Sequence, residues 1–147
     1  MNKNKLVFIG FLLLAVTIPF SCVEEEELVL PPVIVDFSLP LANYPGLLNG
    51  GVPLEWRGEG YKKNGILIFP VGFGDDAQFR AYDATCTRNI SEETTAVKVD
   101  KNNTTATCPT CKTAYNLLTG YAVNQNFHLQ QYVARRDGYG RLHITNN

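Results

Sequence analysis

The sequence predicts an all-β fold made of short antiparallel strands. Short β-prone runs alternate with turns along the chain, which contains 12 glycines and 8 prolines. Two pairs of such runs surround polar turns, at Lys101–Asn103 and at Asp137–Gly138, as β-hairpins do. Strong helix formers do not dominate, and no repeat of solenoid or propeller length is visible.

The size and charge of the chain exclude some function classes. Its 147 residues suffice for one domain with one core. The formal net charge of −1 provides no basic field, so we expect no nucleic-acid partner. The sequence also has no Ser/His/Asp set, no paired-carboxylate arrangement and no phosphate-binding loop, which favours a non-enzymatic function.

The N-terminal segment, residues 1–21, has the pattern of a signal peptide. Lys3 and Lys5 precede the apolar run Leu6–Phe20, which is as long as a signal-peptide core and short for a membrane-spanning helix. A serine and Cys22 follow, and this ending resembles a bacterial lipobox. The resemblance implies cleavage before Cys22 and lipidation of its thiol. The alternative is an ordinary secretory signal in which the cysteine is incidental.

Residues 22–32 are predicted to form an acidic tether. The four adjacent carboxylates of Glu24–Glu27 repel one another and stay solvated, so this stretch favours an extended spacer. Lipid chains on Cys22 would hold the protein on a bilayer without a spanning helix. The acidic run is similar to the export signal of some Gram-negative surface lipoproteins, which implies an outer-membrane protein facing outward. A plain acidic spacer is the alternative.

Five segments are expected to build most of the scaffold. Val33–Phe37 predicts a first strand, and Leu39–Gly51 predicts a loop whose leucines pack on the core. Ile66–Phe69 is an apolar run of strand length. Gln130–Arg135 and Arg141–Thr145 predict a closing hairpin that completes the sheet.

Cysteines follow and precede strands in the middle of the chain. Cys86 comes after the alternating run Gln78–Tyr82, and the Cys-Pro-Thr-Cys segment of Cys108 and Cys111 precedes another β-prone run. A hairpin between the two cysteine segments would return the chain from one loop to the other. Two such loops on a sheet are the usual construction of a small metal or iron–sulfur site.

Beyond the cysteines, several aromatic, apolar and turn residues follow a recognisable pattern. Its members are Phe79, Tyr82, Cys86, Cys108, Pro109, Tyr115, Thr119, Gly120, Leu129, Tyr132, Leu142 and Ile144. This pattern resembles the Rieske [2Fe–2S] domain, and the likeness predicts such a domain over residues 33–147. The resemblance implies small antiparallel sheets, a cluster between two loops at one tip, and one-electron transfer.

The ligand set departs from the family pattern of Cys-x-His and Cys-x-x-His. Cys86 and Cys108 stand at the two cysteine positions, but Arg88 and Cys111 replace the two histidines. A guanidinium stays protonated and has no lone pair to offer, whereas a cysteine thiolate is a competent ligand. Glycines of the family pattern are replaced as well, by Ile90 and Lys112.

Three hypotheses follow for these cysteines. We favour a lipid-anchored domain without a standard cluster, which serves as a structural or binding module for an unidentified protein partner. The first alternative is an electron-transfer protein whose [2Fe–2S] cluster uses Cys86, Cys108, Cys111 and one distant group. The second is a thiol–disulfide protein using Cys108 and Cys111, and zinc bound by three cysteines is a further option.

Overall fold

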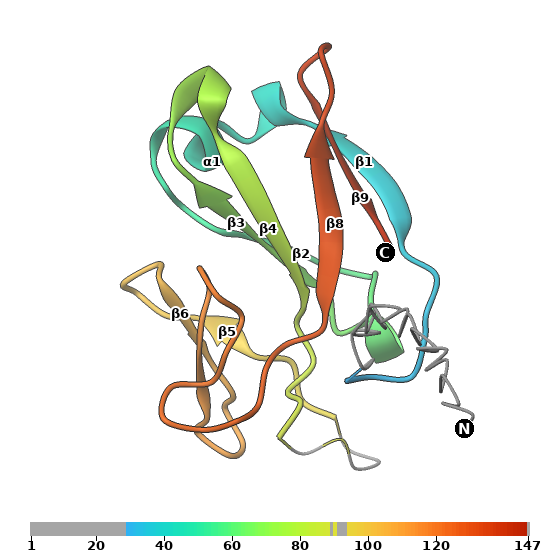
Figure 1. The fold of residues 1–147 in the computed structure, drawn as a ribbon, viewed down its shortest axis with the longest axis vertical. Helices are drawn as coiled ribbons and strands as arrows, with labels where there is room; N and C mark the ends of the chain where they lie inside the picture. The colour runs from blue at the N-terminus through green and yellow to red at the C-terminus, as the bar shows by residue number, and fades with distance from the viewer. Residues whose placement is uncertain (1–28, 89, 91–93, 147) are drawn as a thin grey trace, which may run out of the picture.

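The strands of this chain form two antiparallel sheets in a computed structural model that describes residues 29–88, 90 and 94–146 (Figure 1). The larger sheet has the strand order β1-β9-β8-β4-β3-β2, and the smaller sheet has the order β5-β6-β7. The all-β prediction is therefore confirmed. The strands are β1 (Asp36–Pro40), β2 (Leu54–Trp56), β3 (Ile66–Val71), β4 (Gln78–Asp83), β5 (Lys98–Val99), β6 (Thr105–Thr107), β7 (Ala114–Asn116), β8 (Gln131–Arg136) and β9 (Arg141–Thr145). Short helical segments lie at α1 (Pro45–Asn49), Leu41–Asn43, Tyr61–Lys63 and Gly74–Asp76.

The first strand and the loop after it differ from the sequence prediction. β1 begins at Asp36, which pairs with Thr145 at the end of β9, and this register places Leu39 opposite Leu142, where both side chains are buried. The predicted loop Leu39–Gly51 contains the five-residue helix α1, which has Pro45 in its first turn. Leu47 of this helix packs into the core, as the sequence predicted.

β3 is apolar on both faces because it lies between two hydrophobic clusters. Ile66 and Ile68 face a core formed with β1, β9 and α1. Leu67, which points to the opposite face, joins a second core beneath the smaller sheet. A strand buried on both sides reads as a continuous apolar run rather than as an alternating one.

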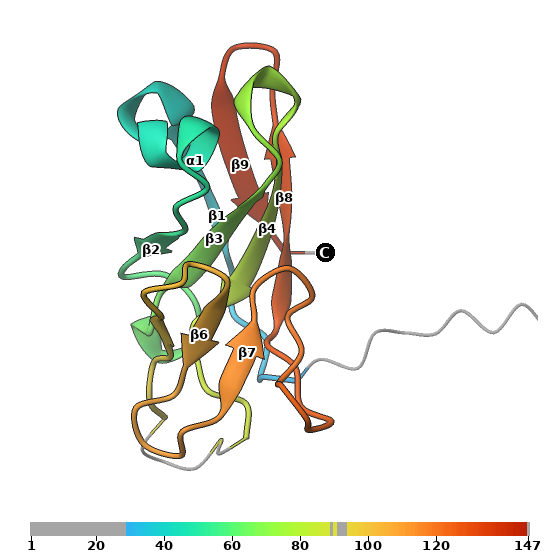
Figure 2. The ribbon, with the colours of Figure 1, turned by 90° about the vertical axis from the view of Figure 1, so that its left-hand side faces the viewer.

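The second core attaches the small sheet to the end of the larger sheet. Tyr82 of β4 packs there with Ala106 of β6 and Tyr115 of β7. In Figure 2 the small sheet occupies the lower end of the molecule, with the larger sheet above it. Gly120 lies against Tyr82 with φ of +80°, and a Cβ at this position would come within 2.6 Å of the tyrosine ring, so only glycine fits.

The buried carboxyl group of Asp83 holds the junction at the end of β4. Its oxygens accept hydrogen bonds from the backbone N–H of Tyr61 at 2.6 Å and of Thr85 at 2.8 Å. The hydroxyl of Tyr132 in β8 donates a third bond at 2.8 Å. Asp83 thus connects two strands of the large sheet to the turn at Tyr61 and to the start of the first cysteine loop.

We predict that Asp83→Ala lowers the free energy of unfolding by about 3 kcal/mol, because three buried donors lose their acceptor. Asp76→Ala, at an exposed carboxylate of a surface turn, is the matched control and should change stability by less than about 0.5 kcal/mol. Urea unfolding followed by circular dichroism measures both. Equal stabilities of the two variants would contradict the role of Asp83.

Candidate functional site: three convergent thiols

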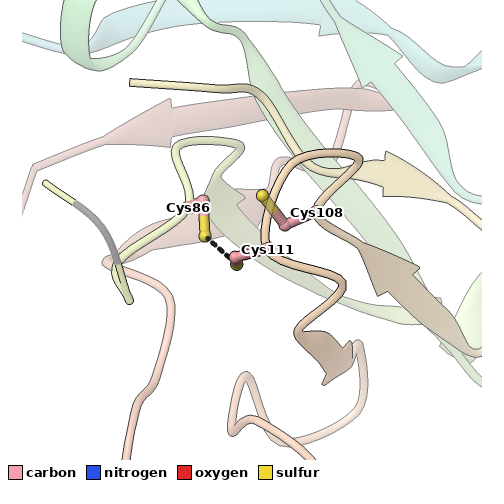
Figure 3. A group of neighbouring side chains, drawn as sticks. All are labelled: Cys86, Cys108 and Cys111. Carbon is pink, nitrogen blue, oxygen red and sulfur yellow. Dashed lines mark hydrogen bonds between the residues drawn. The ribbon is translucent and has the colours of Figure 1, made fainter. Parts of the chain in front are cut away.

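Two loops bring three cysteines together beside the small sheet. Figure 3 shows Cys86 on the loop that follows β4, and Cys108 and Cys111 on the turn between β6 and β7. The three sulfur atoms lie within 4.8 Å of one another. The sulfurs of Cys86 and Cys111 are 3.5 Å apart. The structure therefore brings together the three cysteines that the sequence singled out.

Backbone pairing positions the Cys86 loop. After β4 ends, the N–H of Cys86 donates to the carbonyl of Thr95 at 3.0 Å. On the other side, the N–H of Val97 donates to the carbonyl of Ala84 at 2.7 Å. These two hydrogen bonds tie the start of the loop to the segment that leads into β5. The backbone position of Cys86 is therefore fixed by pairing with that segment.

The turn of Cys108 and Cys111 is closed by its own backbone. The N–H of Lys112 donates to the Cys108 carbonyl, and the N–H of Cys108 donates to the Thr113 carbonyl, both at 2.9 Å. Lys112 adopts φ of +60°, a left-handed conformation that favours glycine. This is one of the positions where the Rieske pattern has glycine, so the turn has a backbone shape that suits the residue of the pattern.

The thiols of Cys86 and Cys111 differ in acidity. Burial raises the pKa of Cys86 to about 11, although a hydrogen bond with Tyr115 opposes that shift. For Cys111, partial burial disfavours the thiolate, but hydrogen bonds from Thr113 and from the other two thiols outweigh it and lower its pKa to about 7. The Cys86 thiol can thus donate to a Cys111 thiolate near neutral pH.

Arg88 acts on Cys111 through Thr113. The guanidinium donates to the Thr113 hydroxyl oxygen at 3.1 Å, and that oxygen lies 3.2 Å from the Cys111 sulfur. Because the oxygen accepts from Arg88, the hydroxyl hydrogen can point at a thiolate. The sequence reasoning missed Thr113, whose burial and contacts arise only when β7 and the Cys86 loop are brought together.

Tyr115 supports the other side of the site. Its side chain is fully buried, and its hydroxyl lies 3.5 Å from the Cys86 sulfur. The same hydroxyl accepts a hydrogen bond from the N–H of Arg88 at 3.2 Å. Burial raises the pKa of Tyr115 to about 12, so the phenol stays protonated at neutral pH. It therefore acts as a packing residue that also contacts the sulfur.

Neither histidine of the chain joins the three thiols. His128 contacts the carbonyl of Leu129 through its ring, and His143 is paired with Asp137 on the β8–β9 hairpin. In the described residues, no histidine or carboxylate completes the cluster of cysteines. A Rieske cluster needs two cysteines and two histidines, so the donor set present does not fit that group.

The predicted lipid anchor lies outside the described residues. Cys22, the signal segment 1–21 and the acidic run of the tether therefore stay predictions. Within the described part of the chain, no helix is long and apolar enough to cross a membrane.

Comparison with solved structures finds similar folds, all at low sequence identity. The plasma membrane Rieske protein of Synechocystis PCC 6803 is 20% identical with a TM-score of 0.49, covering 78% of this chain and 99% of that one. A protein assigned as the small subunit of an NADH-dependent nitrite reductase from Mycobacterium tuberculosis is 16% identical, with a TM-score of 0.43 and coverages of 79% and 98%. The ferredoxin of carbazole 1,9a-dioxygenase from Nocardioides aromaticivorans IC177 is 13% identical, with a TM-score of 0.46 and coverages of 79% and 100%.

No family model matches the chain, and no curated protein matches it. Identities this low describe similar architecture and do not carry ligands or partners from one protein to another.

We predict that, in the reduced protein, Cys111 reacts with iodoacetamide far faster than Cys86 at pH 7. The Cys111 rate should rise as the pH passes about 7, where its thiolate forms. Thr113→Val removes a hydrogen bond to that thiolate and should slow the reaction at pH 7 roughly tenfold. Peptide mapping by mass spectrometry measures the rates.

Thr110→Val is the control for this experiment, because the Thr110 hydroxyl lies in the same turn but contacts Thr95. It should leave the pH profile unchanged. An identical slowing in both valine variants would show that Thr113 has no special effect on Cys111.

Proposed function

We propose that this chain is an exported lipoprotein whose Rieske-like domain lacks a standard [2Fe–2S] cluster and serves as a binding or structural module. The observation that carries this proposal is that Arg88 and Cys111 stand at the two positions where the Rieske pattern has histidine. Arg88 has its guanidinium bound to Thr113, and Cys111 has its sulfur 3.5 Å from that of Cys86. Neither arrangement provides the imidazole ligands of a Rieske centre.

The sulfur positions also argue against a two-iron core of the family type. In the Rieske pattern, the residues at positions 86 and 108 bind one iron, and the residue at position 111 binds the other. Ligands of opposite irons are separated by the width of the core. Here Cys86 and Cys111 are in direct contact. Binding such a cluster would require the sulfurs of Cys86 and Cys111 to move apart.

Electron transfer by an unusual [2Fe–2S] cluster is the second candidate, and the convergence of three thiols is the observation that favours it. This candidate needs a fourth ligand. The two histidines are engaged elsewhere. The fourth ligand would therefore have to be a group that does not lie beside the three thiols in this structure.

A dithiol redox function is the third candidate. The sulfurs of Cys86 and Cys111 lie 3.5 Å apart, and the sulfur of Cys108, the predicted partner of Cys111, lies within 4.8 Å of both. A thiolate that forms near neutral pH beside a protonated thiol is the usual arrangement for thiol–disulfide exchange. The poor accessibility of Cys86 and Cys108, each about 1% exposed, argues against a large protein substrate reaching them.

The proposal predicts that protein expressed anaerobically with added iron binds no stoichiometric iron or inorganic sulfide and has no visible charge-transfer bands. Metal analysis, sulfide analysis and the absorption spectrum measure this. The double variant Arg88→His/Cys111→His, which restores the family ligands, is the matched comparison. Two irons and two sulfides per wild-type chain would refute the cluster-free proposal.

The anchoring part of the proposal predicts that Cys22→Ser releases the protein from the outer-membrane fraction, because the acyl chains are lost. Cys111→Ser, which changes a different thiol, should leave the fractionation unchanged. Protease treatment of intact cells tests the orientation. Replacing Glu24–Glu27 by glutamine should abolish protease access if the acidic run is an export signal, and should preserve it if the run is only a spacer.

A further inference from the structure

The three thiols of Cys86, Cys108 and Cys111 have the spacing of ligands to one metal ion. All three sulfurs lie within 4.8 Å of one another, and two are 3.5 Å apart. A tetrahedral ion with metal–sulfur bonds of about 2.3 Å places its sulfur ligands about 3.8 Å apart. Small side-chain movements would therefore bring the three sulfurs onto one ion, without separating the loops.

The chain around the thiols resembles a built structural metal site. Cys108 and Cys111 have the Cys-x-x-Cys spacing common in zinc sites. Their turn is closed by backbone hydrogen bonds, and a left-handed residue, Lys112, follows the second thiol. Cys86 approaches from a separate loop that is also held by backbone pairing. A ligand pair on one turn and a third ligand from a distant segment would cross-link two parts of the domain.

Hydroxyl groups that can donate to thiolates lie beside two of the sulfurs. The Tyr115 hydroxyl lies beside Cys86, and the Thr113 hydroxyl lies beside Cys111. Such outer contacts orient thiolate ligands and stabilise their charge. Cys86 and Cys108 are buried, whereas Cys111 is partly exposed, so the protein encloses one side of the site and leaves the side of Cys111 open.

Charge favours a divalent ion at this site. Three thiolates around a divalent cation leave one net negative charge. The guanidinium of Arg88 donates to the Thr113 hydroxyl, which lies beside the Cys111 sulfur. Its positive charge offsets the net negative charge of the site. Thiolate ligands in tetrahedral geometry select soft or borderline ions, of which Zn²⁺ is the divalent example without redox chemistry.

We infer that Cys86, Cys108 and Cys111 form a mononuclear trithiolate site for Zn²⁺, with a fourth position open to water or to a partner's ligand. This inference rests on the proposed absence of a two-iron cluster, because both would use the same thiols. On binding, each thiol that is still protonated gives its proton to solvent as its sulfur forms a bond to zinc. The ion would then hold the two loops together in the binding module.

The test uses the full chain, purified in detergent under anaerobic, reducing conditions and titrated with Zn²⁺ and with Co²⁺. We expect one ion per chain, with thiolate-to-Co²⁺ charge-transfer bands and tetrahedral d–d bands. Single changes of Cys86, Cys108 or Cys111 to serine should each weaken binding roughly a hundredfold or more, and Thr113→Val should weaken it about tenfold. Cys22→Ser is the matched control and should bind one ion with unchanged affinity.

Several results would overturn the inference. Wild-type protein that binds no ion, although thiol titration shows its thiols to be reduced, would do so without any variant having to fold. A Cys86–Cys111 disulfide in protein isolated from cells would also do so, as would unchanged binding in a serine variant whose circular dichroism is native. None of these results affects the cluster-free proposal. Two irons with inorganic sulfide would instead refute both proposals.

Discussion

The buried carboxyl group of Asp83 is the contact on which the arrangement of this domain depends. It accepts three hydrogen bonds, from the turn at Tyr61, from β8 through Tyr132 and from Thr85 at the start of the first cysteine loop. Burial of a carboxyl group is costly unless its oxygens are satisfied, so these partners are constrained together. The direction in which the chain leaves β4, and therefore the position of Cys86, follows from this constraint.

The cysteine tip combines a turn whose backbone conformation suits glycine with a ligand set that differs from the Rieske pattern. Lys112 has a left-handed conformation at a position where that pattern has glycine, and Arg88, at a histidine position of the pattern, contacts Thr113. The outcome is a compact thiol site. Cys86 and Cys111 contact each other, and their acidities are set in opposite directions by burial and by hydrogen bonds.

Sequence patterns were most informative where they depend on local chemistry. The hairpin of β8 and β9 around Asp137 follows from turn preferences, and the Cys-Pro-Thr-Cys turn follows from its spacing. They were less informative for β1, whose register depends on pairing with β9 about a hundred residues away. The sequence predicts a loop in place of α1 because the five residues of this helix are too few to produce a helical period.

The sequence by itself determined the all-β class, the cysteine-bearing loops and the absence of histidine at the two positions where the Rieske pattern has it, because each depends on residue identity and short-range spacing. Only the tertiary structure decided which thiols meet. Cys86 contacts Cys111 because the Asp83 junction and the second hydrophobic core bring two loops together. Thr113 and Tyr115 gain their contacts with the sulfurs in the same way, since such long-range packing leaves no signal in the spacing of residues along the chain.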